Sequence, residues 1–172
     1  MTLLELVTVI VVIAILAAML LPAISGIAAR MERAKCTANL RGLYVAAECY
    51  LQDHHQWPQI DANLVAQADS DEYARQWMAA LEPYKISKEN WHCPTVQKIL
   101  AAQPSTDSSG TPKERIDYMA TPFDDKEVTP HLWVTQPWFV ERGAVHGDSG
   151  NLMIFSDGSV KALFEYLPAL KK

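Results

Sequence analysis

The stretch that decides the fold opens the chain, Met1-Thr-Leu-Leu-Glu-Leu-Val-Thr-Val-Ile-Val-Val-Ile-Ala-Ile-Leu-Ala-Ala-Met-Leu-Leu-Pro-Ala-Ile24. The nineteen residues from Leu6 to Ile24 are almost purely apolar. A run of about 20 apolar residues is long enough to cross a bilayer as a helix. Glu5 is the one charged residue before Arg30, and an ionisable group at the start of such a run is costly to bury. The segment therefore predicts an apolar helix whose single acid has a function or a specific partner.

The helical pattern continues past Pro22 into a second half that is apolar on one side only. Apolar residues recur there at steps of four and three, the stripe of an amphipathic helix: Cys36, Leu40, Leu43, Ala47 and Tyr50/Leu51. We expect the helix to end near residues 53–55, because Pro58 disfavours helix at the residue before it. Residues 1–53 would span about 80 Å at about 1.5 Å per residue. The first half should pack in lipid or among like helices, and the second half should lie on a domain.

Length and charge bound what the rest of the chain can be. The chain has 172 residues and a formal net charge of −5. A stalk of about 25 residues leaves a length that suits one globular domain. We expect an apolar helix over residues 1–25 and a globular domain over residues 26–172, which includes the one-sided half of the helix. The mildly acidic balance argues against general nucleic-acid binding, which needs clustered basic charge.

Local patterns in the domain predict one further helix and a small antiparallel sheet. The helix fits residues 71–81, where Tyr73, Trp77 and Leu81 make an apolar face. Strand candidates follow over four stretches, residues 115–120, 131–140, 151–155 and 160–164. Pro137 lacks a backbone donor, so the second stretch should be an edge strand or an interrupted one. The predicted fold class is α+β, with a long N-terminal helix packed by its C-terminal half on a small antiparallel sheet.

The last two strand candidates flank Ser156-Asp157-Gly158-Ser159, which predicts a β-hairpin. A two-residue turn at Asp157-Gly158 would pair Phe155 with Val160 and Met153 with Ala162. We expect one face of this hairpin to meet the long helix.

The N-terminal segment resembles the start of a mature type IV pilin or a type II secretion pseudopilin. Thr2, Glu5 and Pro22, together with the long apolar run, carry that resemblance. Three later segments are similar to a group of pilin-like proteins that have a histidine and a downstream Asp-Gly pair: Arg33-Ala-Lys-Cys-Thr-Ala-Asn-Leu-Arg41, Trp91-His-Cys-Pro94 and His146…Asp157-Gly158. Ten residues separate His146 from Asp157 here, one more than is usual in that group.

The resemblance implies a pilin-like fold and a non-enzymatic structural subunit, which polymerises through its apolar helix into an extracellular or periplasmic helical filament. Met1 would be the first residue after leader removal and the N-methylated residue. Met1, Glu5 and Pro22 would act in assembly, Pro22 either through local unwinding of the stalk or as an ordinary kink. Glu5 should pair with the Met1 amine, its own or that of a neighbouring subunit.

The implied partners are other copies of the chain, a prepilin peptidase/methylase and an inner-membrane assembly machinery. The subunit would wait in a bacterial inner membrane with its domain outside the cytoplasm, and then enter a cell-surface or periplasmic filament. Surface pilus and secretion pseudopilus both remain open. The alternative from another class is a membrane-tethered extracytoplasmic binding module or enzyme that does not polymerise. A converging catalytic constellation would distinguish it, and the sequence does not reveal one.

The three cysteines, Cys36, Cys49 and Cys93, allow at most one intramolecular disulfide. Cys36 lies on the apolar stripe of the first helix and Cys49 points off it, which favours Cys36–Cys93. The alternatives are Cys49–Cys93 and Cys36–Cys49. The last pair would require a broken helix, because the two lie about 20 Å apart along it.

No cofactor or metal is expected from the sequence patterns. His92 and Cys93 are adjacent but lack a second ligand pair at zinc spacing. Asp148 and Asp157, together with Asp107, Asp124 or Asp125, are weak candidates for calcium ligands. Asp157 has the simpler explanation of turn chemistry.

Overall fold

The computed structural model describes residues 3–66, 70–102, 114–143, 146 and 149–168, without the side chains of residues 4, 19–26, 65, 66, 70 and 102. Met1, Asp107 and Asp148 lie outside the described residues. The structure therefore does not test the roles that the sequence predicts for them. The side chain of Pro22 lies outside them as well. The chain divides into two compact units, Met1–Ala34 and Lys35–Lys172, each of which is described by itself. The boundary between these two units follows residue 34. The sequence predicts a boundary after residue 25, and that division stays a prediction.

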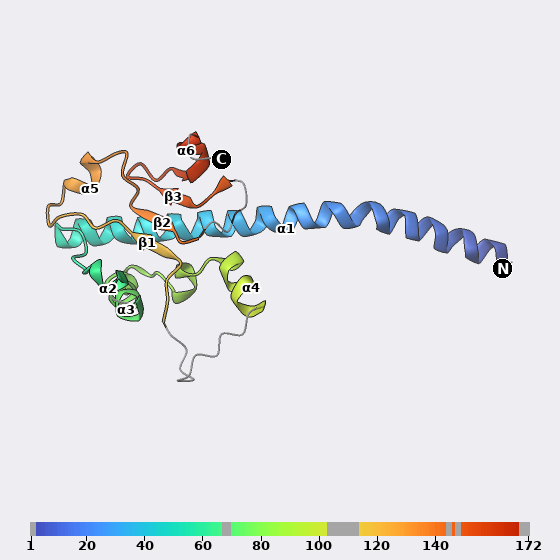
Figure 1. The fold of residues 1–172 in the computed structure, drawn as a ribbon, viewed down its shortest axis with the longest axis horizontal. Coiled ribbons are helices and arrows are strands. Elements are labelled where there is room, and N and C mark those ends of the chain that lie inside the picture. The colour runs from blue at the N-terminus through green and yellow to red at the C-terminus, as the bar shows by residue number, and fades with distance from the viewer. Residues whose placement is uncertain (1–2, 67–69, 103–113, 144–145, 147–148, 169–172) are drawn as a thin grey trace. The chain divides into compact units, whose positions relative to one another are not determined.

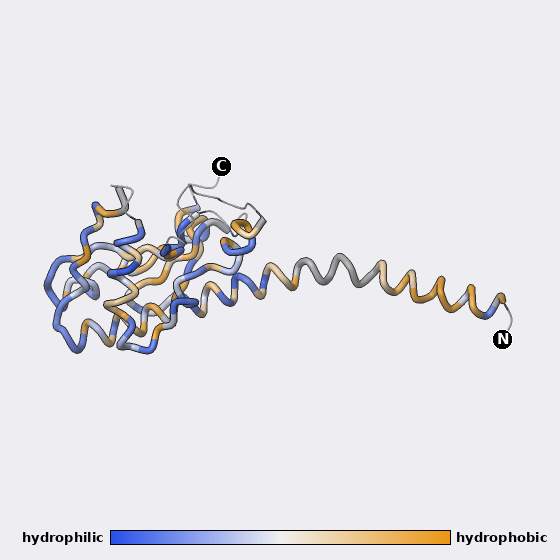
Figure 2. Tube along the Cα trace, turned by 90° about the horizontal axis from the view of Figure 1, so that it is seen from below, coloured by the Kyte–Doolittle hydropathy of each residue, from blue (hydrophilic) through white to orange (hydrophobic). Residues whose placement is uncertain are grey.

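The first unit is a helical segment with apolar side chains on its surface. Helix α1 (Leu3–His54) begins here and continues into the second unit. The large apolar side chains that the structure describes between Leu3 and Leu16 are 44 to 82 % exposed, and Figure 2 shows the hydropathy of this stretch. A search of the described residues for a helix with the length and apolarity of a membrane crossing finds none.

The end of α1 confirms the predicted boundary near residues 53–55. The last helical residue is His54, and His55 follows with a positive φ of 55°. The His55 N–H donates to the Leu51 carbonyl at 2.9 Å, which closes the last turn.

The second unit combines short helices with an antiparallel sheet, so the fold class is α+β, as predicted (Figure 1). The strands β1 (Tyr118–Ala120), β2 (Phe139–Glu141), β3 (Leu152–Ile154) and β4 (Val160–Ala162) pair in the order β1-β2-β3-β4. All three pairings are antiparallel. The helical elements after α1 are α2 (Asn63–Ala66), α3 (Ser70–Leu81), η1 (Glu82–Tyr84), η2 (Lys88–Trp91), α4 (Pro94–Ala102), α5 (Thr129–Leu132) and α6 (Leu163–Tyr166).

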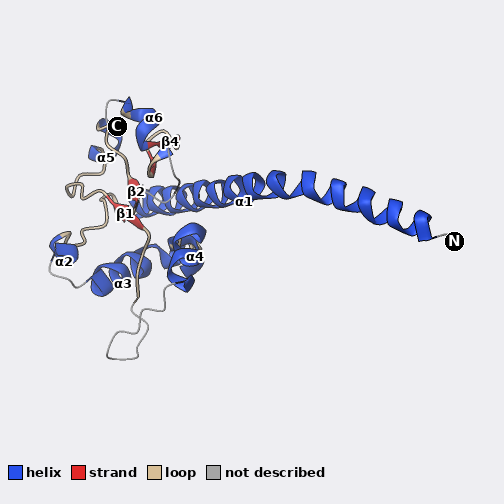
Figure 3. Cartoon of the chain, turned by 45° about the vertical axis from the view of Figure 1, so that its right-hand side comes forward, coloured by secondary structure: helices blue, strands red, loops and turns tan. Residues whose placement is uncertain are grey.

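Helices and strands lie on both sides of the second half of α1 (Figures 1 and 3). Helices α2, α3 and α4 lie on one side, and α5 and α6 lie on the other with the C-terminal strands. Helix α3 confirms the predicted helix over 71–81 and starts one residue earlier.

The core forms where the predicted stripe of α1 meets the sheet and α3. Cys36, Leu40, Leu43, Ala47 and Leu51 are all at most 2 % exposed. They share one cluster with strand residues and with four fully buried indoles, those of Trp57, Trp77, Trp91 and Trp138. The rings of Trp57 and Trp138 meet edge to face, with centroids 5.0 Å apart, a favoured geometry for aromatic pairs. These four tryptophans are therefore core residues of the second unit, whereas Trp133 is 60 % exposed.

The predicted strand over 131–140 is wrong in its first part. Residues 129–132 form the short helix α5, and the strand β2 begins only at Phe139. Pro130 lies in the first turn of α5, where its fixed φ suits a helix and no N–H is needed. Pro137 immediately precedes the paired segment, as its missing donor requires.

The predicted hairpin exists, but its register is shifted by one residue. Ile154 pairs with Val160 and Leu152 with Ala162, instead of Phe155 with Val160 and Met153 with Ala162. Phe155 N–H donates to the Ser159 carbonyl at 3.1 Å and Gly158 N–H to the Phe155 carbonyl at 2.9 Å. The loop is therefore a three-residue one, with Gly158 in the left-handed region at φ 72°. Residues 163–166 form α6 and do not extend the strand.

Candidate functional site

Four side chains that commonly bind metals or react come together inside the second unit. They are Cys36, Cys93, Glu141 and His146, and their ligand atoms all lie within 4.8 Å of one another. Cys36 belongs to α1, Cys93 directly precedes α4, Glu141 ends β2, and His146 lies between β2 and β3. We call these four residues the Cys–His–Glu cluster.

The cluster is tightly spaced and closed to solvent. The two Sγ atoms are 2.9 Å apart, and Cys93 Sγ lies 3.9 Å from His146 Nε2. The same Nε2 atom is 3.0 Å from Glu141 Oε1. Both cysteines are fully buried, and the side chains of His146 and Glu141 are 5 % and 0 % exposed. Such burial is rare for a carboxylate unless it is paired or bound.

Surrounding hydrogen bonds hold the cluster in place. Glu141 Oε2 accepts from the Leu152 N–H at 3.2 Å, and Asn151 donates to the Glu141 carbonyl at 2.8 Å. Near the cysteines, Asn39 lies one turn after Cys36 on α1 and donates to the His92 carbonyl at 3.0 Å. These bonds fix the segment before α4 against α1, and the start of β3 against the end of β2.

Asp117 is the main anchor of Cys93. Its buried carboxylate accepts from the Cys93 N–H at 2.8 Å and pairs with the Arg115 guanidinium at 3.1 Å. Its own N–H donates to the Trp91 carbonyl at 2.8 Å. Burial raises the pKa of Asp117, but bonds from His92, Cys93 and Arg115 outweigh this effect, and the pKa stays below its usual value. Asp117 is therefore a charged support of the cluster.

The electrostatics within the cluster favour a thiolate beside an imidazolium. The hydrogen bond from Cys36 lowers the pKa of Cys93, and the same bond together with burial raises the pKa of Cys36. Hydrogen bonds to Cys93 and Glu141 raise the pKa of His146 to about 9. Burial raises the pKa of Glu141. The cluster thus gathers negative groups around one ring nitrogen.

This geometry does not suit nucleophilic catalysis. In a catalytic relay the base uses one ring nitrogen towards the nucleophile and the other towards an orienting acid. Here Cys93 and Glu141 both approach Nε2 of His146. Cys93 is also fully buried, so a substrate has no access to its sulfur.

The structure brings Cys36 and Cys93 together, as the predicted disulfide requires. Their Sγ distance of 2.9 Å exceeds the length of about 2.05 Å of a disulfide bond. Neither cysteine forms a disulfide in the structure, and neither does Cys49, which is half-buried elsewhere on α1. The bond itself stays a prediction.

The structure does not bring the other described candidates of the sequence into the cluster. Asp157 is exposed, and its carboxylate accepts from the Ser159 N–H at 2.8 Å, a turn-stabilising bond. Asp124 accepts from the Lys126 N–H at 3.2 Å in the same way. His92 is not one of the four cluster residues, and its Nδ1 lies 3.8 Å from Asp117 Oδ2. The local turn explanation of Asp157 is confirmed.

Sequence reasoning singled out His146 but missed Glu141. One signal was available, because Phe139 and Glu141 lie two residues apart in a strand and so share one face. Both are buried, whereas Val140 between them is half-buried. A charged residue on the same strand face as a core phenylalanine is expected to be buried.

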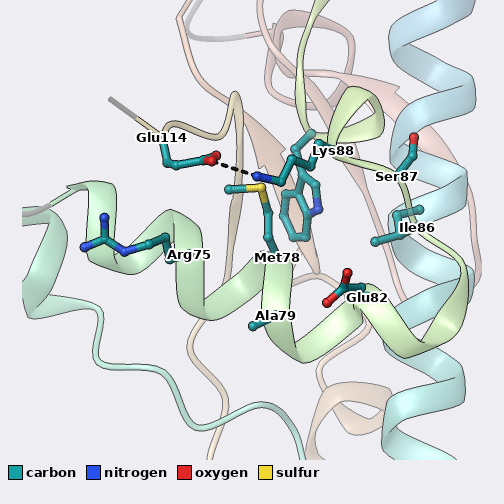
Figure 4. A pocket seen from close by; sticks show the side chains of 9 residues that line it. Arg75, Met78, Ala79, Glu82, Ile86, Ser87, Lys88 and Glu114 are labelled. Carbon is teal, nitrogen blue, oxygen red and sulfur yellow. Dashed lines mark hydrogen bonds and ion pairs between the residues drawn. The ribbon is translucent and has the colours of Figure 1, made fainter. Parts of the chain in front are cut away.

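A separate surface pocket of about 440 Å³ opens beside α3 and η2 (Figure 4). Met78, Ile86 and Trp91 supply apolar lining. Lys88 Nζ pairs with Glu114 Oε1 at 2.7 Å across one side of it. The lining residue Arg75 is engaged with Glu72 at 2.9 Å. The two basic side chains of this pocket, Arg75 and Lys88, thus pair with acids instead of converging on a ligand position.

The apolar surface of the first unit is the other candidate, and Glu5 lies on it. Glu5 is exposed, and Thr8 Oγ1 donates to its carbonyl at 2.9 Å. Most of the residues that follow Glu5 along the helix are aliphatic and exposed, so this part of α1 is apolar on every side. We call residues 3–18 the apolar rod.

The chain matches no protein-family model, no curated protein and no solved structure.

Proposed function

We propose that this protein is a structural subunit, a pilin or pseudopilin, that polymerises through its apolar N-terminal helix into a helical filament. The observation that carries the proposal is the apolar rod. Consecutive residues from Val9 to Ile13 are all 49 to 59 % exposed. Because successive helical residues are about 100° apart, such a run faces every direction, and one flat partner surface cannot cover it.

A bundle of identical helices covers such a rod completely. Single soluble chains rarely expose a contiguous apolar patch larger than a few hundred Å², so the rod needs an apolar environment. Before assembly the inner membrane supplies that environment, with the domain outside the cytoplasm. In the filament, neighbouring copies replace lipid, and specificity comes from close packing and from polar pairing.

Glu5 fits this role as the polar determinant of the rod. A carboxylate withdrawn from water carries a large desolvation penalty unless a cation pairs with it. A neighbouring subunit in the correct register brings such a cation, which we take to be an N-terminal amine exposed and methylated by a prepilin peptidase/methylase. Other registers leave the acid unpaired, so Glu5 would also set the axial step between subunits.

The second unit supports the same proposal. A long helix whose second half shares its core with a small antiparallel sheet is the arrangement of a pilin-like fold. The alternative of a tethered enzyme has less support, because the Cys–His–Glu cluster is buried and the basic side chains of the surface pocket are paired with acids. The partners that follow are other copies of the chain and an inner-membrane assembly machinery.

The test compares two exposed aliphatic residues with equal exposure. Ile13 in the rod is 59 % exposed and Val128 in the domain is 58 % exposed. Ile13→Glu places an additional acid in the subunit contacts with no cation to pair with it, which costs several kcal/mol. We expect filament yield to fall more than about tenfold, since about 1.4 kcal/mol already gives a factor of ten. Val128→Glu should leave the yield unchanged.

Filament yield is measured by electron microscopy and sedimentation of sheared cell-surface and periplasmic fractions. Equal expression and equal near-ultraviolet circular dichroism of the two variants serve as controls for folding. Equal filament yields from both variants, or dispersed monomers of the unaltered protein under every condition, would contradict the proposal and favour a tethered module.

A further inference from the structure

We propose that the Cys–His–Glu cluster is a closed structural site for a zinc-type divalent cation. The ligands would be Sγ of Cys36, Sγ of Cys93, Nε2 of His146 and a carboxylate oxygen of Glu141. This proposal is independent of filament formation, because all four residues belong to the second unit.

The donor set selects the class of metal. Two thiolates and one imidazole are the ligands of a borderline-soft cation such as Zn²⁺, and one carboxylate is a common fourth ligand. Ca²⁺ and Mg²⁺ prefer six or more oxygen ligands, which these four side chains do not offer. Full burial of both sulfurs fits a structural site, in which protein ligands fill all the positions.

The spacing of the donor atoms suits a tetrahedral ion. With Zn–S near 2.3 Å and Zn–N near 2.0 Å, neighbouring ligand atoms in a tetrahedron lie roughly 3.3–3.8 Å apart. The cluster shows 3.0 Å between His146 Nε2 and Glu141 Oε1 and 3.9 Å between Cys93 Sγ and His146 Nε2. The sulfurs, 2.9 Å apart, need to separate by about 0.9 Å to reach the tetrahedral spacing. Side-chain rotations of this size leave the backbone in place.

Charge gives a second reason for a cation. Glu141 is a buried carboxylate beside two buried cysteines, and within the cluster only the ring of His146, 3.0 Å away, can offset its charge. A divalent cation among two thiolates, a carboxylate and a neutral imidazole leaves a net charge of about −1. The Leu152 N–H on Glu141 Oε2 then acts as the outer support that such ligands commonly have.

A disulfide accounts for only half of the cluster. Closing Cys36–Cys93 needs the sulfurs to approach by about 0.9 Å, a movement as small as the one for the metal. It would use neither Glu141 nor His146 and would leave both buried beside an apolar bond. The metal uses all four groups, and for this reason we favour it. Bond formation and metal binding exclude each other, so one experiment distinguishes them.

A metal at this point would tie together four separate parts of the second unit. Its ligands come from α1, the segment before α4, the end of β2 and the segment between β2 and β3. A ligand that binds the folded state alone stabilises it, by about 2.7 kcal/mol at a concentration 100 times its Kd. The site would therefore stabilise the domain without taking part in a reaction.

The test uses the full-length protein in detergent, purified with a thiol reductant, and Zn²⁺ or Co²⁺ as the probe. Metal content is measured by mass spectrometry after gel filtration, and Co²⁺ binding by its thiolate charge-transfer and tetrahedral d–d absorption. We expect one tightly held ion per chain in the unaltered protein and in the control Cys49→Ser. Cys93→Ser should abolish the thiolate band of this ion or weaken it strongly.

Glu141→Gln is the variant that keeps the shape of the cluster if Cys93→Ser does not fold. It should lower Co²⁺ affinity by about 10–100-fold, while circular dichroism stays unchanged. Three results would overturn the proposal: no stoichiometric ion on the reduced, unaltered protein, a Co²⁺ spectrum without thiolate character, or equal loss of metal in Cys49→Ser. A quantitative Cys36–Cys93 disulfide in peptide maps of protein alkylated directly from cells would also overturn it, and would establish the disulfide instead.

Discussion

At the residue scale, Asp117 shows how a buried charge is kept in this core. Its side chain is 6 % exposed and is satisfied by the Arg115 guanidinium and the Cys93 N–H. Breaking a buried pair is costly because the remaining charge is left without compensation. Asp117 thus joins the strand β1 to the segment that carries Cys93.

We expect Asp117→Ala to lower the free energy of unfolding by about 3–5 kcal/mol. The substitution strands the half-buried Arg115 and leaves the buried Cys93 N–H without its acceptor. Denaturant unfolding followed by tryptophan fluorescence measures the effect. Asp125→Ala, at an exposed position, is the control and should stay within about 0.5 kcal/mol of the unaltered protein. Equal stabilities of the two variants would disprove the anchoring role.

At the scale of elements, the hairpin β3–β4 is held by its loop and by α1. Tyr44 on α1 donates to the Ser156 carbonyl at 2.9 Å, and Gly158 in the same loop has a φ of 72°. A Cβ at Gly158 would meet Tyr44 Cε1 at 3.5 Å, which is an ordinary contact. Space is therefore available there, and only the backbone conformation restricts the residue.

This distinction yields a paired prediction for Gly158. Gly158→Val should destabilise the protein by about 1–3 kcal/mol, because a β-branched residue is strained in the left-handed region. Gly158→Asn should cost less than about 1 kcal/mol, because asparagine visits that region more readily. Thermal unfolding of both variants measures the difference. If the Gly158→Val and Gly158→Asn variants had the same melting temperature, the loop would not be held in this conformation.

At the scale of the whole molecule, each unit has its own means of burying apolar surface. The second unit buries its apolar stripe internally, against four tryptophans and the sheet. The rod in the first unit keeps its aliphatic side chains exposed. In the filament that we propose, other copies would bury the rod, and Glu5 would set the register in which they meet.

Glu5→Ala should leave the domain folded and reduce polymer formation. It removes one partner of a pair that is buried only in the filament, a loss on the order of 3–5 kcal/mol per contact. Filament mass per cell, measured by shearing and quantitative blotting, reports the effect. Glu165→Ala, an exposed acid in the domain, should behave like the unaltered protein. Normal filament yield from Glu5→Ala would remove the assembly role of this residue.

Local sequence patterns were sufficient for α1, for its two surfaces and for α3, but not for the shorter helices. The apolar run, the stripe from Cys36 to Leu51 and the pattern over 71–81 predicted α1, its buried face and α3 correctly. Helical periodicity depends on neighbours three and four residues apart, so this information is local. The approach of Cys36 to Cys93 also followed from that stripe.

Contacts between distant residues decided what the patterns left open. The hairpin slipped by one residue because Gly158 favours a three-residue loop, and residues 131 and 132 became helical where the sequence had predicted a strand. In the Cys–His–Glu cluster, Cys93 and His146 are 53 positions apart along the chain. No periodicity connects residues at such separations. Their meeting depends on how α1, the sheet and the loops pack, and so only the tertiary structure reveals the cluster.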